Sequence, residues 1–474
     1  MYLFLQAQIA TFVVLGFSTH RPFLWNVLVG VFMTVIVPHS DRKIKFPSHG
    51  FDKPAIHLSM STREKRYDVI VIGGGASGMM AAGRAAERGR SVLLLEKNTK
   101  PGKKLDTTGG GRCNITNAEF DVHVLLKHYG AAEQFLYSPF SQFGVRSTFD
   151  FFEGHGLPLV VEARKRVFPV TQKATDVTHT LKDYLIGHGV EISTGTTVKK
   201  IHAANGRITE VVTSRGTFAA DNFILAVGGA SHPETGSTGD GFDWLSTLGH
   251  TVIPPTPTLV PLRVRDAWVK KLAGITLPNM KITFFVDGKR MFAKKGRLLF
   301  THFGLSGPLI LNSAHLVRDL LSGGTVTCAI DAFPDTDFSA LEKRIIASID
   351  ANKNKNFKNV INDVVPAGMG SAYISLLKLP DPGLKAHSLT KEDRKRFVHL
   401  LKAAPATIES LMGYDRAIVS DGGIPLAEVD MRTMRSLKIP NLFLIGDVLH
   451  INRPSGGYSL QLCWTTGFVA GSNT

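Results

Sequence analysis

The feature that most constrains the fold is the segment 67–97, YDVIVIGGGASGMMAAGRAAERGRSVLLLEK. Its residues 69–72 form a short β-branched run that is typical of a buried parallel strand. Glycines with G-x-G-x-x-G spacing follow, residues 77–88 have a helical composition, and residues 91–95 predict a second strand before Glu96. Strand, glycine loop, helix, strand and acid in this order predict a dinucleotide-binding Rossmann unit.

Each part of this unit has a chemical role in binding a dinucleotide. Gly73 allows the tight turn, Gly75 lets backbone amides approach a pyrophosphate, and Gly78 lets the helix pack closely on the strand. The helix N-terminus provides free N–H groups for the phosphates. Glu96 is positioned to accept the hydroxyl groups of an adenosine ribose. The motif by itself does not distinguish FAD from NAD(P).

The rest of the chain favours FAD. Residues 197–213 predict a hairpin around an Asn-Gly turn, and the strand expected over 217–227 runs into Gly228-Gly229. Further on, residues 442–445 predict a buried strand that ends at Gly446-Asp447, before a helix that starts near residue 458. Such a Gly-Asp is suited to bind the ribityl chain of FAD, and the helix N-terminus is suited to face the flavin N1–C2 edge.

A second glycine-rich stretch, TGGGRCNITN, covers residues 108–117. Three consecutive glycines are costly to order, because glycine loses more backbone freedom on folding than any other residue. We predict that Gly109, Gly110 and Gly111 press backbone against FAD. The three residues that follow are expected to border the flavin; they are Arg112, Cys113 and Asn114.

The two halves of this domain are far apart in sequence, so the segment between them must be an insertion. Residues 252–262, VIPPTPTLVPL, are interpreted as a proline-rich hinge, residues 259–332 as β-structure with a hairpin at Asp287-Gly288, and residues 339–411 as mostly helical. We therefore predict an α/β fold with an inserted β-barrel-like domain and a small helical domain. The expected boundaries are an FAD-binding Rossmann domain at 60–253 and 412–474, a barrel at 254–335 and a helical insert at 336–411.

Charge and cysteine content narrow the class of protein. The net charge of +16 favours anionic partners, but the basic residues are dispersed along the chain. We interpret the charge as that of a protein attracting anionic cofactors, in preference to nucleic-acid binding. The 3 cysteines are far apart, which excludes a disulfide framework and fits a reducing compartment. No metal-binding spacing is present among the 17 histidines, so no metal site is predicted.

Residues 1–59 differ from the rest. Two apolar blocks lie within 1–37, and the second has fewer than the roughly 20 residues that span a bilayer. A membrane anchor and an over-extended start before Met60 are both considered, and the over-extended start is favoured. A cytoplasmic location is expected, with membrane attachment through residues 1–37 as the alternative.

The motifs together resemble the BaiN/RdsA-like family of NAD(P)/FAD-dependent oxidoreductases. The resemblance covers roughly residues 67–471 and rests on six stretches: GGGASG (73–78), TGGGRCNITN (108–117), GGASHPETGSTGDG (228–241), FTHFGLSGP (300–308), SDGGI (420–424) and RPSGGYSLQ (453–461). It implies a FAD-binding Rossmann domain with an inserted barrel and a helical domain. The chemistry it implies is reduction of conjugated carbon–carbon double bonds in steroid-like molecules, or oxidation of a small amino ketone.

The chain departs from the family pattern at three places. Residues 446–450 read Gly-Asp-Val-Leu-His where Gly-Glu-Val-Leu-Asp is usual, and SDGGI stands where Thr-Ala-Gly-Gly-Val is commoner. Ser459 stands where asparagine is usual. Asp447 keeps the carboxylate, whereas His450 and Ser459 alter polar groups near the expected flavin.

The expected reaction is hydride transfer through flavin N5, with NAD(P)H as the electron donor and a small molecule as the substrate. Arg112 is a candidate to offset charge on the flavin or the substrate. Cys113 is considered as a redox thiol, although the favoured interpretation is that it is a small packed residue. His302 and Tyr458 are candidate proton donors. The candidate cofactor-binding residues are Gly73, Gly75, Ala76, Ser77, Gly78, Glu96, Lys97, Gly109, Gly110, Gly111, Arg112, Cys113, Asn114, Val198, Gly228, Gly229, Gly446, Asp447, Gly456, Gly457, Tyr458, Ser459 and Leu460.

Two other functions remain open at this stage. One is an oxygen-dependent amine or amino-ketone oxidase. The other, from a different class, is a basic RNA-modifying flavoprotein, which the +16 charge motivates.

Overall fold

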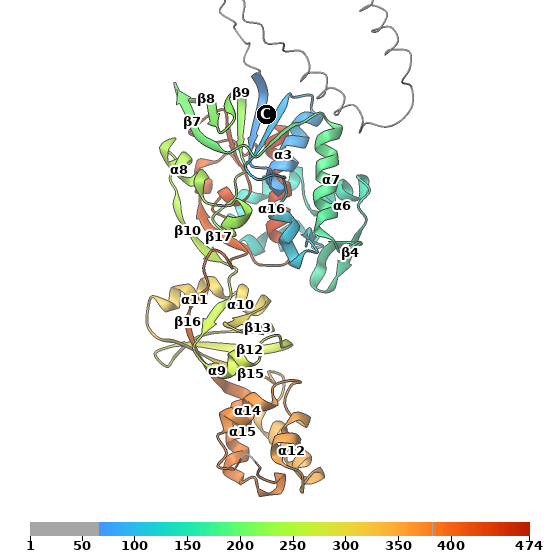
Figure 1. Cartoon of the computed structure of the whole chain (residues 1–474), viewed down its shortest axis with the longest axis vertical. Coiled ribbons are helices and arrows are strands. Elements are labelled where there is room, and N and C mark those ends of the chain that lie inside the picture. Colours follow the sequence, from blue (N-terminus) through green and yellow to red (C-terminus); the bar gives the residue numbers. More distant parts are fainter. Residues whose placement is uncertain (1–65, 382) are drawn as a thin grey trace, which may run out of the picture. The chain divides into compact units, whose positions relative to one another are not determined.

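The computed structural model describes residues 66–381 and 383–474 (Figure 1). The expectations for residues 1–59, an anchor or an over-extended start, lie outside these described residues. Within residues 66–381 and 383–474, no helix combines the length and the apolar character needed to cross a membrane.

The nucleotide-binding domain is built on a seven-stranded sheet. Its order is β6 (Glu191–Thr194), β2 (Val92–Glu96), β1 (Arg66–Ile72), β9 (Gly216–Leu225), β8 (Arg207–Thr213) and β7 (Val198–Ala204), and β18 (Leu442–Leu444) also pairs with β9. The pairs β6–β2, β2–β1, β1–β9 and β9–β18 are parallel, and nearly all side chains of β1 and β2 are buried. The predicted Rossmann unit is therefore confirmed, with two distant segments of the chain meeting in one sheet.

Helix α3 (Ala76–Glu87) is the central helix of this domain and contacts α16 (Tyr458–Ser472) and α7 (Ala174–Gly187) (Figure 1). Glycines permit the close packing of α16 on α3. A Cβ atom at Gly467 would lie 2.5 Å from the carbonyl oxygen of Ser77, and one at Gly471 would lie 2.4 Å from that of Ala81. The remaining helices of the domain are α4 (Val122–Leu126), α5 (Glu133–Gln142), α6 (Val145–Gly154) and α8 (Asp240–Thr247), beside a three-stranded sheet of β3 (Thr116–Asn117), β5 (Arg166–Pro169) and β4 (Leu159–Glu162).

The inserted segment begins with a closed barrel that has a hydrophobic core of its own. The barrel order is β11 (Leu262–Val264), β14 (Gly304–Ser306), β13 (Lys289–Thr301), β12 (Thr276–Val286), β15 (Val326–Asp331) and β16 (Ala404–Leu411), with α9 (Ala267–Lys271), α10 (Pro308–Leu311) and α11 (Ala314–Leu321) between strands. Both predicted hairpin turns are confirmed. Asn205-Gly206 has φ angles of 51° and 73°, and Asp287-Gly288 has 47° and 81°, which are the left-handed values that such two-residue turns require.

Two sequence expectations for the insert are wrong. Residues 253–258 are not a hinge but the strand β10, which pairs with β17 (Val419–Gly423). Its prolines are tolerated because β10 pairs on one side only. Residues 404–411 are not helical but form β16, which closes the barrel between β15 and β11. Burial at every second residue, Ala404, Ala406 and Ile408, is the pattern of a strand. The Lys, Leu and Ala content of residues 339–411 favoured a helix instead.

The helical part of the insert packs on the barrel. It contains α12 (Phe338–Ala351), α13 (Phe357–Val360), α14 (Gly370–Leu377) and α15 (Lys391–Ala403). The side chains of Asp337 and Thr390 cap α12 and α15 by accepting from backbone amides of the first turn. Apolar residues of these helices join the hydrophobic core of the barrel, whereas the nucleotide-binding domain has a separate core.

Candidate functional site

A cavity of the described residues lies where β1, β2 and β9 end. It has a volume of about 180 Å³ and is lined by Ile72, Glu96 and Ala226 at the three strand ends. Ligands of open parallel sheets bind at the carboxyl ends of the strands, so this is the expected place for a nucleotide.

Eleven of the predicted residues line this cavity; they are Gly73, Gly75, Ala76, Ser77, Glu96, Lys97, Val198, Gly228, Asp447, Ser459 and Leu460. Other predicted residues are not part of its lining: Gly78, Gly109, Gly110, Gly111, Arg112, Cys113, Asn114, Gly229, Gly446, Gly456, Gly457, Tyr458 and His302.

The three glycines of the first loop have different roles. A Cβ atom at Gly73 would lie 2.6 Å from the Ala226 carbonyl oxygen, and one at Gly78 would lie 1.9 Å from the Gly73 carbonyl oxygen. Both are therefore required by packing. Gly75 has φ −80°, and apart from its two chain neighbours no atom of the described residues lies within 4 Å of the position of its Cβ. The open space beside Gly75 belongs to the cavity, which fits a pyrophosphate at the N-terminus of α3.

Glu96 is held rigidly at the end of β2. One carboxylate oxygen accepts a hydrogen bond from the Gly74 amide at 2.8 Å, and the other accepts from the Asn98 amide and side chain, both at 2.7 Å. The residue is only 7% exposed. Because a carboxylate oxygen has two lone pairs, the oxygen that accepts from Gly74 alone keeps capacity to accept from a ribose hydroxyl.

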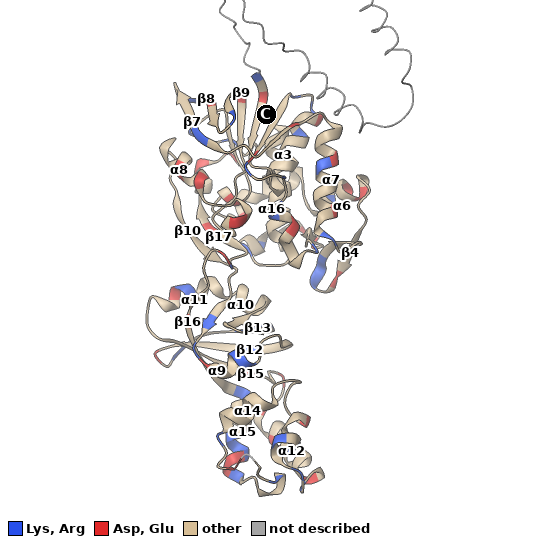
Figure 2. Cartoon of the chain, viewed as in Figure 1, with Lys and Arg blue, Asp and Glu red and all other residues tan. Residues whose placement is uncertain are grey.

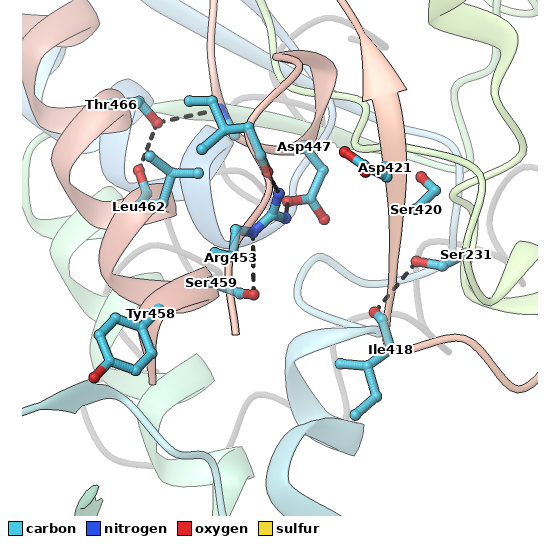
Figure 3. Close-up of polar contacts among 12 residues, drawn as sticks. Ser231, Ile418, Ser420, Asp421, Asp447, Arg453, Tyr458, Ser459, Leu462 and Thr466 are labelled. Carbon is cyan, nitrogen blue, oxygen red and sulfur yellow. Dashed lines mark hydrogen bonds and ion pairs between the residues drawn. The ribbon is translucent and has the colours of Figure 1, made fainter. Parts of the chain in front are cut away.

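The other end of the cavity is organised by an ion pair between Asp447 and Arg453 (Figure 3). The Arg453 side chain is 2% exposed and also donates to the Ile451 carbonyl oxygen at 2.5 Å and to the Ser459 hydroxyl at 3.2 Å. Asp447 follows β18, and Ser459 lies in the first turn of α16. Arg453 thus fixes the carboxylate of Asp447 and the beginning of α16 relative to one another.

Lys104 also lines this end of the cavity, and sequence reasoning missed it. Its ammonium group donates to the Ser231 hydroxyl at 2.6 Å and to the Ser231 carbonyl oxygen at 3.1 Å. Burial lowers the pKa of Lys104, and the negative charge of Asp447 opposes that change. In the sequence Lys104 is one of two adjacent lysines, a pattern typical of a solvated surface, so no local signal pointed to it.

The second glycine loop leaves the cavity after Thr108, which is part of the lining. Gly109, Gly110 and Gly111 are exposed and have φ angles of 59°, 69° and 85°. All three adopt the left-handed conformation that favours glycine. The amides of Gly111 and Cys113 donate to the Thr108 carbonyl oxygen, both at 3.0 Å.

The residues after these glycines differ in their surroundings. Arg112 forms an ion pair with Glu162 and donates to Gln172 at 2.6 Å. Cys113 is fully buried, and burial raises the pKa of its thiol to about 12, as expected of a packed residue. Asn114 has a buried side-chain oxygen without a hydrogen-bond partner among residues 66–381 and 383–474, which leaves an acceptor available for a bound group.

The start of α16 packs on strand β3. A Cβ atom at Gly457 would lie 2.3 Å from the Thr116 carbonyl oxygen, and the Asn117 side chain donates to the Gly456 carbonyl oxygen at 3.2 Å. Tyr458 is 7% exposed, and burial raises the pKa of its hydroxyl. His302 is exposed in the turn between β13 and β14. The structure therefore brings Tyr458, but not His302, into an element that lines the cavity.

Comparisons with known proteins found a matching family model and several similar proteins. The model of the family described as "HI0933-like protein Rossmann domain" matches residues 67–473. A protein of Clostridium scindens named 3-dehydro-bile acid delta(4,6)-reductase is 30% identical over 85% of this chain and 97% of its own length. The Escherichia coli ribosomal RNA dihydrouridine synthase is 27% identical over 85% of this chain and 97% of its own length. The solved structure of a 3-ketosteroid-Δ4-(5α)-dehydrogenase from Rhodococcus jostii covers 88% of this chain and 98% of its own, with 15% identity and a TM-score of 0.48.

Proposed function

The chain belongs to the HI0933-like family and is an oxidoreductase, and we propose that it binds FAD and reduces a carbon–carbon double bond conjugated to a carbonyl group. We propose NAD(P)H as the electron donor and a small or steroid-like molecule as the substrate.

The observation that carries the cofactor proposal is the cavity beside Gly75. Neither backbone conformation nor protein packing requires a glycine there, whereas a dinucleotide pyrophosphate needs the space. The N-terminus of α3 would bind the pyrophosphate, Glu96 the adenosine ribose and Asp447 the ribityl chain. FAD supplies hydride transfer through its N5 atom when bound.

The reaction class is supported by what the two relatives have in common. Their names describe reduction of a bile acid double bond and formation of dihydrouridine, which is uridine reduced at a ring double bond. Both double bonds are conjugated to a carbonyl group. Hydride addition to the far carbon places negative charge on the carbonyl side, so a proton must then be delivered to the near carbon.

Tyr458 is the proton donor that we propose for this step. It opens α16, whose next two residues line the cavity, and its raised pKa keeps the hydroxyl protonated at neutral pH. The second predicted donor, His302, is exposed in the turn between β13 and β14, neither of which lines the cavity, so we give it no role in proton transfer.

The test is to purify the full chain and mix it anaerobically with NADH or NADPH while recording the flavin absorbance. Rapid bleaching of the flavin is the expected result. A colourless protein that could not be reconstituted with FAD would contradict the cofactor proposal. A flavin that is bleached only by an amine or amino ketone, and not by either pyridine nucleotide, would favour the oxidase instead.

A second candidate is reduction of a base in RNA, and the distribution of charge favours it. Residues 254–411 contain 23 Lys and Arg against 13 Asp and Glu, whereas residues 66–253 and 412–474 together contain 25 against 23 (Figure 2). A basic inserted segment suits a polyanionic substrate. Retention of a uridine-containing RNA that weakens steeply with salt would support this candidate, and absence of retention at low salt would exclude it.

A further inference from the structure

A strained turn presents basic side chains beside the second glycine loop. Strands β4 and β5 are joined by residues 163–165, in which Arg164 and Lys165 have φ angles of 63° and 57°. A non-glycine residue in the left-handed region costs about 1–2 kcal/mol, and such strain persists only where the surroundings fix it. The carbonyl oxygens of both residues are fixed here, by the Asn117 side chain at 3.3 Å and the Ala118 amide at 2.7 Å.

Two arginines beside this turn share one carboxylate. Glu162 forms an ion pair with Arg112 and approaches Arg166 at 3.7 Å. Both guanidinium groups lie over the buried ring of Phe168. That of Arg112 is 4.1 Å and that of Arg166 is 5.5 Å from the ring centroid. Both guanidinium groups are therefore held in place, and they share the one negative charge of Glu162.

Two further arginines add positive charge that no carboxylate of the described residues pairs with. Arg164 at the turn and Arg297 on β13 are exposed, and within the described residues neither guanidinium group has a hydrogen bond or ion pair. Burial is the main cause that lowers the pKa of Arg166, and the negative charge of Glu162 opposes it. The positive charges of Arg297, Arg112 and Arg164 lower the pKa of Arg166 further. The four residues are called the arginine cluster below; they are Arg112, Arg164, Arg166 and Arg297.

The arginine cluster is linked to two segments that line the cavity, once through the Asn117 side chain and once along the chain. The Asn117 side chain donates both to the Arg164 carbonyl oxygen and to the Gly456 carbonyl oxygen, at 3.3 Å and 3.2 Å. Gly456 leads directly into α16, where Ser459 lines the cavity. On the other side, the chain passes from Thr108 in the cavity lining to Arg112 within four residues.

We propose that the arginine cluster binds an anionic oxygen group of the substrate, a carboxylate or a phosphate. This inference rests on the proposed function, because it assigns a substrate to the cavity beside the cluster. Guanidinium groups bind both oxyanions in a bidentate manner, and planar arginines already fixed on an aromatic ring lose little entropy on binding. The phosphates of FAD have their own site at the N-terminus of α3, so they do not account for the cluster.

The direct test measures binding of inorganic phosphate to the FAD-loaded protein by calorimetry, so that the pyrophosphate site is already filled. The double variant Arg164→Gln/Arg297→Gln should bind phosphate at least about tenfold more weakly than the unmodified protein. Arg207→Gln is the matched control, because Arg207 is an exposed arginine on β8 away from the cluster. Equal phosphate affinity in all three proteins would overturn the proposal.

A second measurement identifies the source of the anion. The substrates compared are a 3-oxo-Δ4 steroid carboxylic acid, its neutral methyl ester and a uridine-containing RNA. If the anion is a carboxylate, the double variant should lose about tenfold in kcat/KM for the acid and nothing for the ester. If it is a phosphate, the same loss should appear with RNA instead. Equal losses for acid and ester would contradict charge recognition. Turnover of none of the three substrates would contradict the proposed function, while the phosphate measurement would still test the anion site.

Discussion

The two glycine-rich loops of this protein keep their glycines for different physical reasons. In the first loop, Gly73 and Gly78 are required because a side chain would collide with the backbone. In the second, Gly109 to Gly111 have left-handed φ angles, and a Cβ atom at Gly110 or Gly111 would meet no atom within 4 Å in the part of the chain that the structure describes, chain neighbours aside. The first loop is constrained by packing, and at Gly73, where φ is 104°, by conformation as well, whereas the second loop is constrained by conformation.

Gly75 belongs to neither class, and this makes the comparison informative. It has an ordinary φ of −80° and free space around its Cβ position. A glycine that neither packing nor conformation requires, and that lines the cavity at the start of α3, fits a ligand that comes close to the backbone. Substitutions at the three kinds of glycine should therefore separate folding from cofactor binding.

The largest effect is expected for Gly78→Ala. Its methyl group would lie 1.9 Å from the Gly73 carbonyl oxygen, so the first turn of α3 must move away from the loop. We expect a loss of about 3 kcal/mol in the free energy of unfolding, measured in urea, together with loss of bound FAD. Gly154→Ala, at the end of α6 with free space around it, is the matched control and should not destabilise the protein. Unchanged stability of Gly78→Ala would refute the packing argument.

Gly75→Ala should separate cofactor binding from folding. Its conformation suits alanine, which restricts the unfolded chain, but Gly75 is the N-cap of α3, where alanine is less favourable than glycine. The FAD-free protein should therefore keep its stability within about 0.5 kcal/mol. The methyl group would nevertheless occupy space that we assign to the pyrophosphate, so FAD affinity should fall by about tenfold, or about 1.4 kcal/mol. Both quantities are measurable, by urea unfolding of the apoprotein and by FAD titration. If FAD affinity is unchanged, the cavity beside Gly75 does not hold the pyrophosphate.

Gly110→Val should have a smaller effect on folding and tests the second loop. A side chain at φ 69° costs about 1–2 kcal/mol, somewhat more for a β-branched residue. Gly206→Val is the matched control, because Gly206 has φ 73° and free space at the tip of the β7–β8 hairpin, outside the cavity lining. Both variants should lose similar stability, and only Gly110→Val should also lose FAD. Equal FAD retention in the two variants would show that the second loop does not contact the cofactor.

The sequence was sufficient to predict the elements whose signals are local. The Rossmann unit at 67–97, both hairpin turns and the start of α16 all depend on neighbouring residues. Lys104 could not be predicted, because its burial arises from contacts with Ser231, which lies 127 positions further along the chain. Strand β16 was missed for a related reason: its partners β15 and β11 are supplied by distant segments.

The arginine cluster shows the same limit at the candidate site. Arg112 was a candidate from its motif, but Arg164 and Arg297 have no sequence signal that distinguishes them from other exposed arginines. Their proximity follows from the β4–β5 turn and from a barrel strand, which are separated by more than a hundred residues. Chemistry assembled by tertiary structure therefore requires the fold before it can be recognised.

The smallest effect is expected at Cys113, which ends the comparison of the two loops. If the second loop contributes backbone rather than redox chemistry, Cys113→Ala should leave the rate of flavin reduction by NADH within about twofold, because burial raises the pKa of the thiol to about 12. At pH 8 such a thiol remains protonated, and the thiolate appears only as the pH rises toward that pKa. Cys328→Ala in the barrel core is the matched control, since burial raises its pKa to about 12 as well. A loss of flavin reduction in Cys113→Ala alone would mean that the second loop supplies a reactive sulfur. The glycines of that loop would then serve to expose the sulfur to the flavin, rather than to approach the cofactor themselves.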